Sequence, residues 1–176
     1  YAFLRRILIP ILILFVLAAP VSAAEEFLER FSTEHYELWY LGERCGYAWD
    51  YVNRVRLDGR EVWKIYREEV SFLKGTNCRQ KTVVENLDYY SQDFTLVHSI
   101  HALRDGGQVK LTEISVTGNR ADITVSLDGR SISYQVMIKP GTVMLPSGFQ
   151  LWKMGNIVEN SAVSIPVLVP ELRAVV

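Results

Sequence analysis

The two cysteines of the 176-residue chain, Cys45 and Cys78, are its first candidates for chemistry. A catalytic thiol needs a histidine that activates it and an acceptor that orients this histidine. Cys45 falls in a predicted strand, without the helix N-terminus that commonly activates a thiol. No local motif links it to His98 or His101. We therefore expect no catalytic role for either cysteine.

A disulfide bond between Cys45 and Cys78 is the other use of these thiols. In an oxidising compartment it would close a loop of about 34 residues and stabilise the fold by about 3–4 kcal/mol. The predicted strands, however, place the two residues on either side of one intervening strand. They would then lie about 9–10 Å apart, beyond the disulfide reach of about 7 Å. The sequence leaves both outcomes open.

His98 and His101 are three residues apart, a spacing that brings two side chains to one metal ion only on a helix. Residues 94–103 alternate like a strand, in which positions i and i+3 face opposite sides. Four carboxylates show no pairing in their spacing, and we expect them to be solvated: Asp50, Glu68, Glu69 and Glu85. A glycine-rich phosphate loop is also absent from the sequence. We predict no catalytic residue, no metal and no cofactor.

Aromatic residues are densest between positions 36 and 66. Eight of them lie there: Tyr36, Trp39, Tyr40, Tyr47, Trp49, Tyr51, Trp63 and Tyr66. One interpretation is a core filled by large β-forming side chains, which is the more common arrangement. The other is an apolar concavity that receives a lipid or another apolar ligand. The candidate ligand-binding residues of that concavity are Trp39, Trp49, Tyr51 and Trp63.

Tight turns and alternating apolar residues predict the elements that must position these side chains. Four dipeptides supply the positive φ values of hairpin turns: Asp58-Gly59, Asp105-Gly106, Gly118-Asn119 and Asp128-Gly129. Apolar residues alternate between them, most regularly over residues 130–138. The pattern predicts strands over residues 35–41, 44–57, 61–74, 78–90, 94–104, 108–117, 120–127 and 130–139. A change of phase near Thr112-Glu113 predicts a β-bulge.

Hairpins that follow one another predict a mainly β fold, an antiparallel meander that curls into a half-barrel or open barrel. Residues 24–33 place Phe27, Leu28 and Phe31 at helical spacing after two glutamates, which predicts a short N-terminal helix. Residues 149–154 are predicted to form one helical turn at an open end of the sheet.

The first 23 residues have the features of a secretory signal peptide. Arg5-Arg6 precedes an apolar run over residues 7–19, and small residues around Ala23 offer a cleavage site. The run is shorter than the about 20 apolar residues of a membrane span, although an uncleaved anchor is an alternative. We therefore expect a periplasmic or secreted protein without a stable membrane span after cleavage. Residues 24–176 are predicted to form a single β-rich domain, truncated at its C-terminus.

The balance of charged residues argues against one class of partner, nucleic acids. Residues 24–176 contain 17 Lys and Arg and 20 Asp and Glu, a net charge of −3. A protein that attracts nucleic acid usually carries a basic face, which this balance does not favour. We therefore predict no nucleic-acid partner.

Residues 35–47, with the sequence HYELWYLGERCGY, resemble the opening of a group of exported bacterial β-sheet domains of unknown function. That opening has an aromatic strand, a turn around a glycine, and a second strand that starts with glycine and an aromatic residue. The turn Asp58-Gly59-Arg60 continues the resemblance. Such domains occur alone or ahead of transglutaminase-like cysteine-protease domains, and they are similar in shape to half-barrel lipoprotein carriers of the LolA/LolB type. The resemblance implies a concave face that accepts acyl chains and no peptidase residues on this chain.

Together these features predict an exported, non-enzymatic β-sheet protein that binds an apolar or envelope ligand or a protein partner. The alternative is the N-terminal accessory domain of a transglutaminase-like cysteine peptidase.

Overall fold

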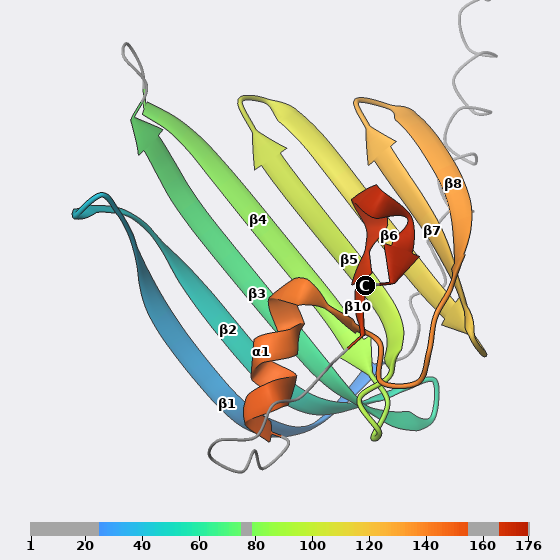
Figure 1. Ribbon diagram of the computed structural model, residues 1–176. Helices are drawn as coiled ribbons and strands as arrows, with labels where there is room; N and C mark the ends of the chain where they lie inside the picture. The colour runs from blue at the N-terminus through green and yellow to red at the C-terminus, as the bar shows by residue number, and fades with distance from the viewer. Residues whose placement is uncertain (1–24, 75–78, 155–165, 176) are drawn as a thin grey trace, which may run out of the picture.

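Eight antiparallel strands form one sheet in the computed structural model, which describes residues 25–74, 79–154 and 166–175 (Figure 1). Each strand pairs with the next one in the chain, so the sheet is a meander whose edges are β1 and β8. The strands are β1 Glu25–Tyr40, β2 Glu43–Leu57, β3 Arg60–Lys74, β4 Arg79–Tyr90, β5 Leu96–Asp105, β6 Gln108–Thr117, β7 Arg120–Leu127 and β8 Arg130–Met137. The predicted mainly β meander is confirmed, and the sheet does not close into a barrel.

Hairpin turns form at or next to the four predicted dipeptides, and two of these dipeptides have the predicted pair of positive φ values. The β5–β6 turn is Gly106-Gly107, one residue later than predicted, and in Gly118-Asn119 only the glycine has a positive φ. Asp58 and Gly59 have φ values of 48° and 79°, and Asp128 and Gly129 have 48° and 80°. Two successive positive φ values match the right-handed twist of the flanking strands, so these short turns connect long paired strands without splaying them.

The predicted N-terminal helix over residues 24–33 is wrong, because Glu25 begins β1. The register between β1 and β2 shifts between Phe27 and Glu29 and again between Arg30 and Ser32. Leu28 and Phe31 are the extra residues at these shifts. Each extra residue changes the phase of the alternation, and two changes close together produce the spacing that resembles a helix.

The predicted bulge near Thr112-Glu113 is also wrong. The pairing of β6 with both β5 and β7 runs through these residues without a shift. Lys110, Thr112 and Ile114 all lie on the same face of the sheet. The apolar pattern changes phase because the first two of these residues are polar and the third is apolar.

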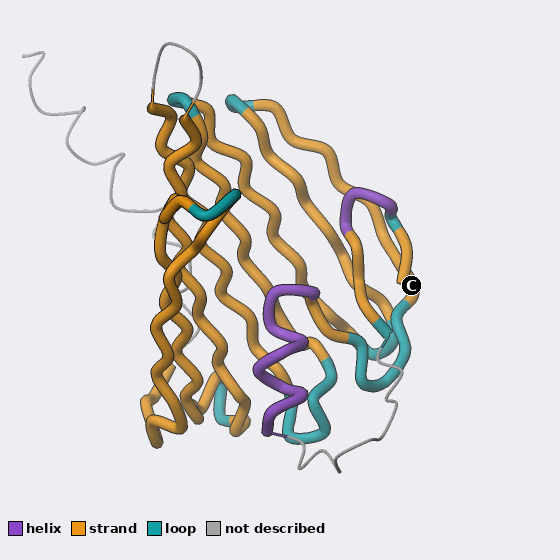
Figure 2. Tube along the Cα trace, turned by 60° about the vertical axis from the view of Figure 1, so that its left-hand side comes forward, coloured by secondary structure: helices purple, strands orange, loops and turns teal. Residues whose placement is uncertain are grey.

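The chain after β8 returns over one face of the sheet, which we call the inner face (Figures 1 and 2). We call this returning part the cover. It consists of β9 Val143–Met144, α1 Leu145–Met154, β10 Val167–Val169, the 3-10 helix η1 Pro170–Leu172 and β11 Ala174–Val175. The helical turn predicted at residues 149–154 is part of α1. In Figure 1, α1 crosses β2 and β3, and β10 and η1 lie over β5 and β6.

The main core lies between the inner face and the cover. Its largest enclosed side chains come from β3 to β7 of the sheet and from β9 and β10 of the cover. They are Ile65, Tyr90, Leu96, Ile114, Ile123, Met144 and Leu168. A smaller cluster of Val55, Val62 and Tyr89 is separate from it. Among the described residues, no helix has the length and apolarity needed to cross a membrane.

Candidate functional site

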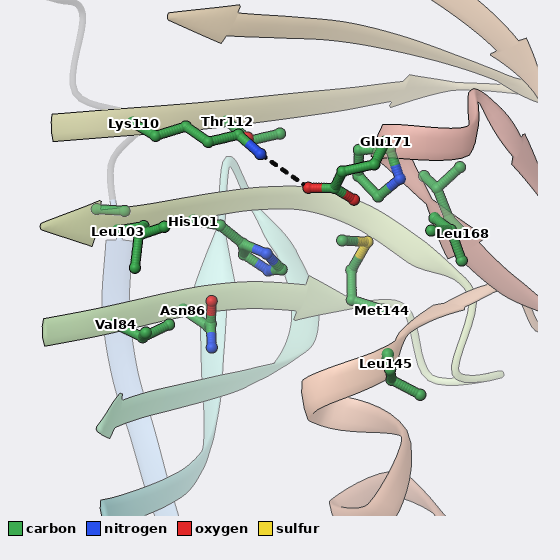
Figure 3. Close-up of a pocket in the computed structure, with 13 residues that line it drawn as sticks. Val84, Asn86, His101, Leu103, Lys110, Thr112, Met144, Leu145, Leu168 and Glu171 are labelled. Carbon is green, nitrogen blue, oxygen red and sulfur yellow. Dashed lines mark hydrogen bonds and ion pairs between the residues drawn. The ribbon is translucent and has the colours of Figure 1, made fainter. Parts of the chain in front are cut away.

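A groove of about 330 Å³ lies between the inner face of β4, β5 and β6 and the cover (Figure 3). Eight of its thirteen lining residues are apolar: Val84, Ala102, Leu103, Met144, Leu145, Leu168, Val169 and Pro170. The other five are Asn86, His101, Lys110, Thr112 and Glu171. An apolar hollow with a few convergent polar groups is the usual form of a small-molecule site, and we therefore treat it as the candidate site.

The polar residues on the floor of the groove belong to one row of cross-strand neighbours, which we call the polar row. Asp50 of β2 pairs with Arg67 of β3, and Arg67 pairs with Asn86 of β4. Asn86 then pairs with His101 of β5, and His101 with Thr112 of β6. Paired residues on neighbouring strands face the same side of a sheet, so five polar side chains cross the inner face in a line.

At its β2–β3 end, the polar row is covered and satisfied by α1. Asp50 is 2% exposed, and its carboxylate lies 3.2 Å from the Arg67 guanidinium. The Gln150 side chain of α1 donates a hydrogen bond of 2.7 Å to the same carboxylate. A buried carboxylate is stable only with such partners, so this end of the row attaches α1 to the sheet.

Asp88, in the row next to the polar row, links the groove to the cover. It is fully buried and accepts hydrogen bonds from His101 Nε2, at 2.9 Å, and from the Ser147 hydroxyl of α1. Tyr90 accepts a hydrogen bond of 3.0 Å from the backbone N–H of Met144. Burial and the Asp88 carboxylate raise the pKa of Tyr90 well above its ordinary value, so its hydroxyl stays protonated.

Two members of the polar row, Asn86 and Thr112, are buried and have no hydrogen-bond partner among the described residues. Their exposed fractions are 4% and 5%. The fully enclosed side-chain atoms that lack a partner are those of Asn53, Arg54 and Ser99. Since Asn86 and Thr112 are not among them and both line the groove, their polar atoms open onto it.

An ion pair closes one side of the groove. Lys110 Nζ of β6 lies 2.9 Å from Glu171 Oε1 of η1 (Figure 3). The hydrogen bond from Lys110 holds the pKa of Glu171 below its ordinary value, so the pair stays charged near neutral pH. The pair attaches η1 to the sheet beside the apolar lining.

A second ion pair attaches the end of α1 to β1, and it makes this contact sensitive to acid. The hydrogen bond from Lys153 lowers the pKa of Glu34, and the same bond raises the pKa of Lys153. A carboxylate with a lowered pKa stabilises the fold above its ordinary pKa and loses this contribution as the pH falls through the lowered value. Because Lys153 is partly exposed, solvent screening keeps the contribution below about 1 kcal/mol.

We therefore expect Glu34→Gln to lower the melting temperature at pH 7, and the difference from the wild type to shrink as the pH falls below 4.5, the ordinary value for this carboxyl. Thermal unfolding followed by circular dichroism from pH 7 to pH 3 measures this difference. The control is Glu113→Gln, an exposed glutamate, which should show no such trend. A difference that stays constant down to pH 3 would contradict the assignment.

Trp49 and Tyr51, two of the candidate ligand-binding residues, lie on the outer face. Asp50 between them contacts α1, so its two sequence neighbours face the opposite side of the sheet. There they stack with a centroid distance of 6.4 Å, and His35 stacks on Trp49 at 4.3 Å.

Trp63 lies on the inner face but does not line the groove. It packs at the margin of the main core, with ring centroids 5.5 Å from Phe31 and 6.5 Å from Phe94. Trp39 is 61% exposed near the β1–β2 turn. The four predicted aromatic residues therefore do not converge on one cavity, and their role in binding a ligand stays a prediction.

The other candidate residues have separate positions. Cys45 is half-buried, and its thiol donates to the Leu38 carbonyl oxygen at 3.4 Å. Cys78 lies outside the described residues, so the disulfide stays a prediction. His98 and His101 lie on opposite faces as predicted, since His98 contacts Ser115 and His101 contacts Asp88.

Sequence reasoning missed the functional candidates of the groove. It expected Asp50 to be solvated, whereas this residue is buried and paired. It also attributed the phase change in β6 to a bulge, although Lys110 and Thr112 are polar residues that line the groove. The sequence did contain a signal for these residues: they are polar at strand positions where the alternation predicts apolar side chains.

No protein-family model matches this sequence, and no curated protein or solved structure is significantly similar to it.

Proposed function

We propose that this protein is an exported, non-enzymatic binding protein that holds an apolar ligand in the groove. In this proposal the curled sheet acts as a half-barrel, and the cover encloses the ligand against its inner face. Residues 1–23 would direct the chain to the periplasm or the outside of the cell.

The observation that carries the proposal is the mainly apolar lining of the groove, which combines exposed and buried side chains. Leu145 and Leu103 are 72% and 38% exposed, whereas Met144 and Leu168 are almost fully buried. All four line the same groove. An apolar ligand entering at the exposed leucines would exchange water contacts for buried apolar contacts along its length, which is favourable at about 25 cal/mol per Å² of apolar surface.

The size of the groove fits a small ligand. Its volume of about 330 Å³ is near the lower limit of about 300–1,000 Å³ for small-molecule sites. The groove therefore suits one chain or ring system better than a multi-chain lipid. A role as an accessory domain of a peptidase has no comparable observation in its favour.

The proposal predicts saturable binding of a neutral apolar dye. N-phenyl-1-naphthylamine should gain fluorescence when titrated with the purified protein. Leu103→Glu places a charge in the apolar lining and should weaken dye binding at least tenfold. The matched control is Leu41→Glu, an exposed leucine of the β1–β2 turn that does not line the groove, and it should bind the dye like the wild type.

Two outcomes would contradict the proposal: no saturable dye binding by the folded wild type, or an equal loss of binding in both leucine variants. Circular dichroism of each variant verifies that it is folded.

A further inference from the structure

We infer that the ligand carries, next to a single apolar chain, an uncharged amide or ester group that Asn86, His101 and Thr112 recognise. This inference rests on the proposed function, and it specifies the chemical class of the ligand.

Asn86 and Thr112 are the first argument. Both side chains are more than nine-tenths buried and line the groove without forming a hydrogen bond to a described residue. A ligand that fills the groove displaces water from these two side chains, and their polar groups then need new partners. A ligand that forms hydrogen bonds with them supplies such partners, whereas a hydrocarbon of the same length does not.

The positions of the three residues match one polar group. Asn86, His101 and Thr112 are direct cross-strand neighbours on β4, β5 and β6. Side chains paired in this way lie about 5 Å apart, so the three span about 10 Å of the groove floor. Figure 3 shows Asn86 and His101 on adjacent strands, with Met144 and Leu168 of the cover beside them. A single head group beside an apolar chain can reach all three.

The hydrogen-bonding capacity of the three side chains is mixed. The Asn86 amide and the Thr112 hydroxyl can each donate and accept. His101 Nε2 is bound to Asp88, and Nδ1 has no partner among the described residues. With Nε2 protonated toward Asp88, Nδ1 is an acceptor in the neutral ring. A carbonyl oxygen can accept from Asn86 or Thr112, and an amide N–H can donate to Nδ1.

The charges around the groove disfavour an ionic head group. Lys110 lies 2.9 Å from Glu171, and His101 lies 2.9 Å from the fully buried Asp88. A ligand carboxylate would lie close to the carboxylates of Glu171 and Asp88, which already accept from Lys110 and His101. A ligand ammonium would lie close to the Lys110 ammonium. Since like charges at short range repel strongly in a partly buried site, the uncharged head group is favoured over both.

The test is a competition between head groups on one chain length. Decanamide, decanoate, decylamine and decane each displace N-phenyl-1-naphthylamine from the full-length protein at pH 7. We expect decanamide to displace the dye at concentrations at least tenfold below those of the other three. We compare the concentrations of decane and of decanamide that displace the same share of the dye. Their ratio measures recognition of the head group, independently of dye affinity.

Two substitutions assign this ratio to the polar row. Asn86→Leu and Thr112→Val remove the polar groups while keeping similar volumes, and each should lower the ratio at least threefold. Thr112→Val is the smaller change and keeps the test decisive where Asn86→Leu fails to fold. The control is Ser99→Ala, which removes an enclosed hydroxyl outside the groove and should leave the ratio unchanged.

The outcomes are distinguishable. Equal displacement by all four compounds, or a preference for decanoate or decylamine, would overturn the inference and leave the proposed function in place. An equal ratio in the wild type, Asn86→Leu and Thr112→Val would also overturn it. Absence of saturable dye binding in the wild type would overturn the proposed function, and the inference with it.

Discussion

Asp88→Ala is expected to lower the free energy of unfolding by about 3 kcal/mol, because it removes the one acceptor shared by His101 and Ser147. Both donors lose their shared acceptor, and each buried donor left without a partner costs about 1–3 kcal/mol. His101 contributes at the lower end of this range, because its side chain is 19% exposed. Urea unfolding followed by tryptophan fluorescence measures the change in free energy.

The control for Asp88→Ala is Asp122→Ala. Asp122 lies on β7, where its partly exposed carboxylate accepts a hydrogen bond of 2.7 Å from Gln135. A surface substitution of this kind changes stability by about 0.5 kcal/mol or less. Similar losses for the two alanine variants would show that Asp88 does not link α1 to the sheet.

Gly46→Ala should destabilise the fold by about 3 kcal/mol, at the upper end of the usual cost of overpacking. Gly46 is buried in β2, opposite Ser71 of β3. A Cβ atom at this position would collide with the Val70 carbonyl oxygen and lie 2.9 Å from the Ser71 Cα. Both are backbone atoms, so the collision is relieved only by moving one strand away from the other. The midpoint of urea unfolding reports the effect.

The same substitution at Gly148 provides a control of opposite sign. Gly148 lies inside α1, and a Cβ atom there would meet only the Val143 side chain, at 3.4 Å. Alanine is favoured over glycine in a helix by about 1 kcal/mol, so Gly148→Ala should stabilise the protein or leave it unchanged. If Gly46→Ala unfolds at the wild-type midpoint, the proposed close approach of β2 and β3 is wrong.

Local sequence patterns were sufficient to predict most of the sheet. Turn dipeptides such as Asp58-Gly59 have strict backbone requirements, and apolar alternation has a period that only a strand produces. The pattern failed in β1, where two register shifts change the phase. Since a bulge is set by pairing with the neighbouring strand, its position is not visible in one strand alone.

The candidate site was less predictable, because it depends on pairing across strands. Asn86, His101 and Thr112 form no motif in the sequence and become neighbours only through the register of β4, β5 and β6. The face covered by α1 was also not predictable from alternation. In β2 this face carries small or polar residues, Ala48 and Asp50, and the large aromatic residues lie on the other side.

The meander topology has a consequence for the order in which the molecule folds. Every strand pairs with its sequence neighbour, so each hairpin closes a short loop, and the sheet can grow one hairpin at a time at a low entropic cost. The contacts of the cover bridge much longer stretches of chain, 59 residues from Asp88 to Ser147 and 119 from Glu34 to Lys153. We therefore expect α1 to dock only on a completed sheet, so that the groove between the sheet and the cover is the last part of the protein to acquire its native shape.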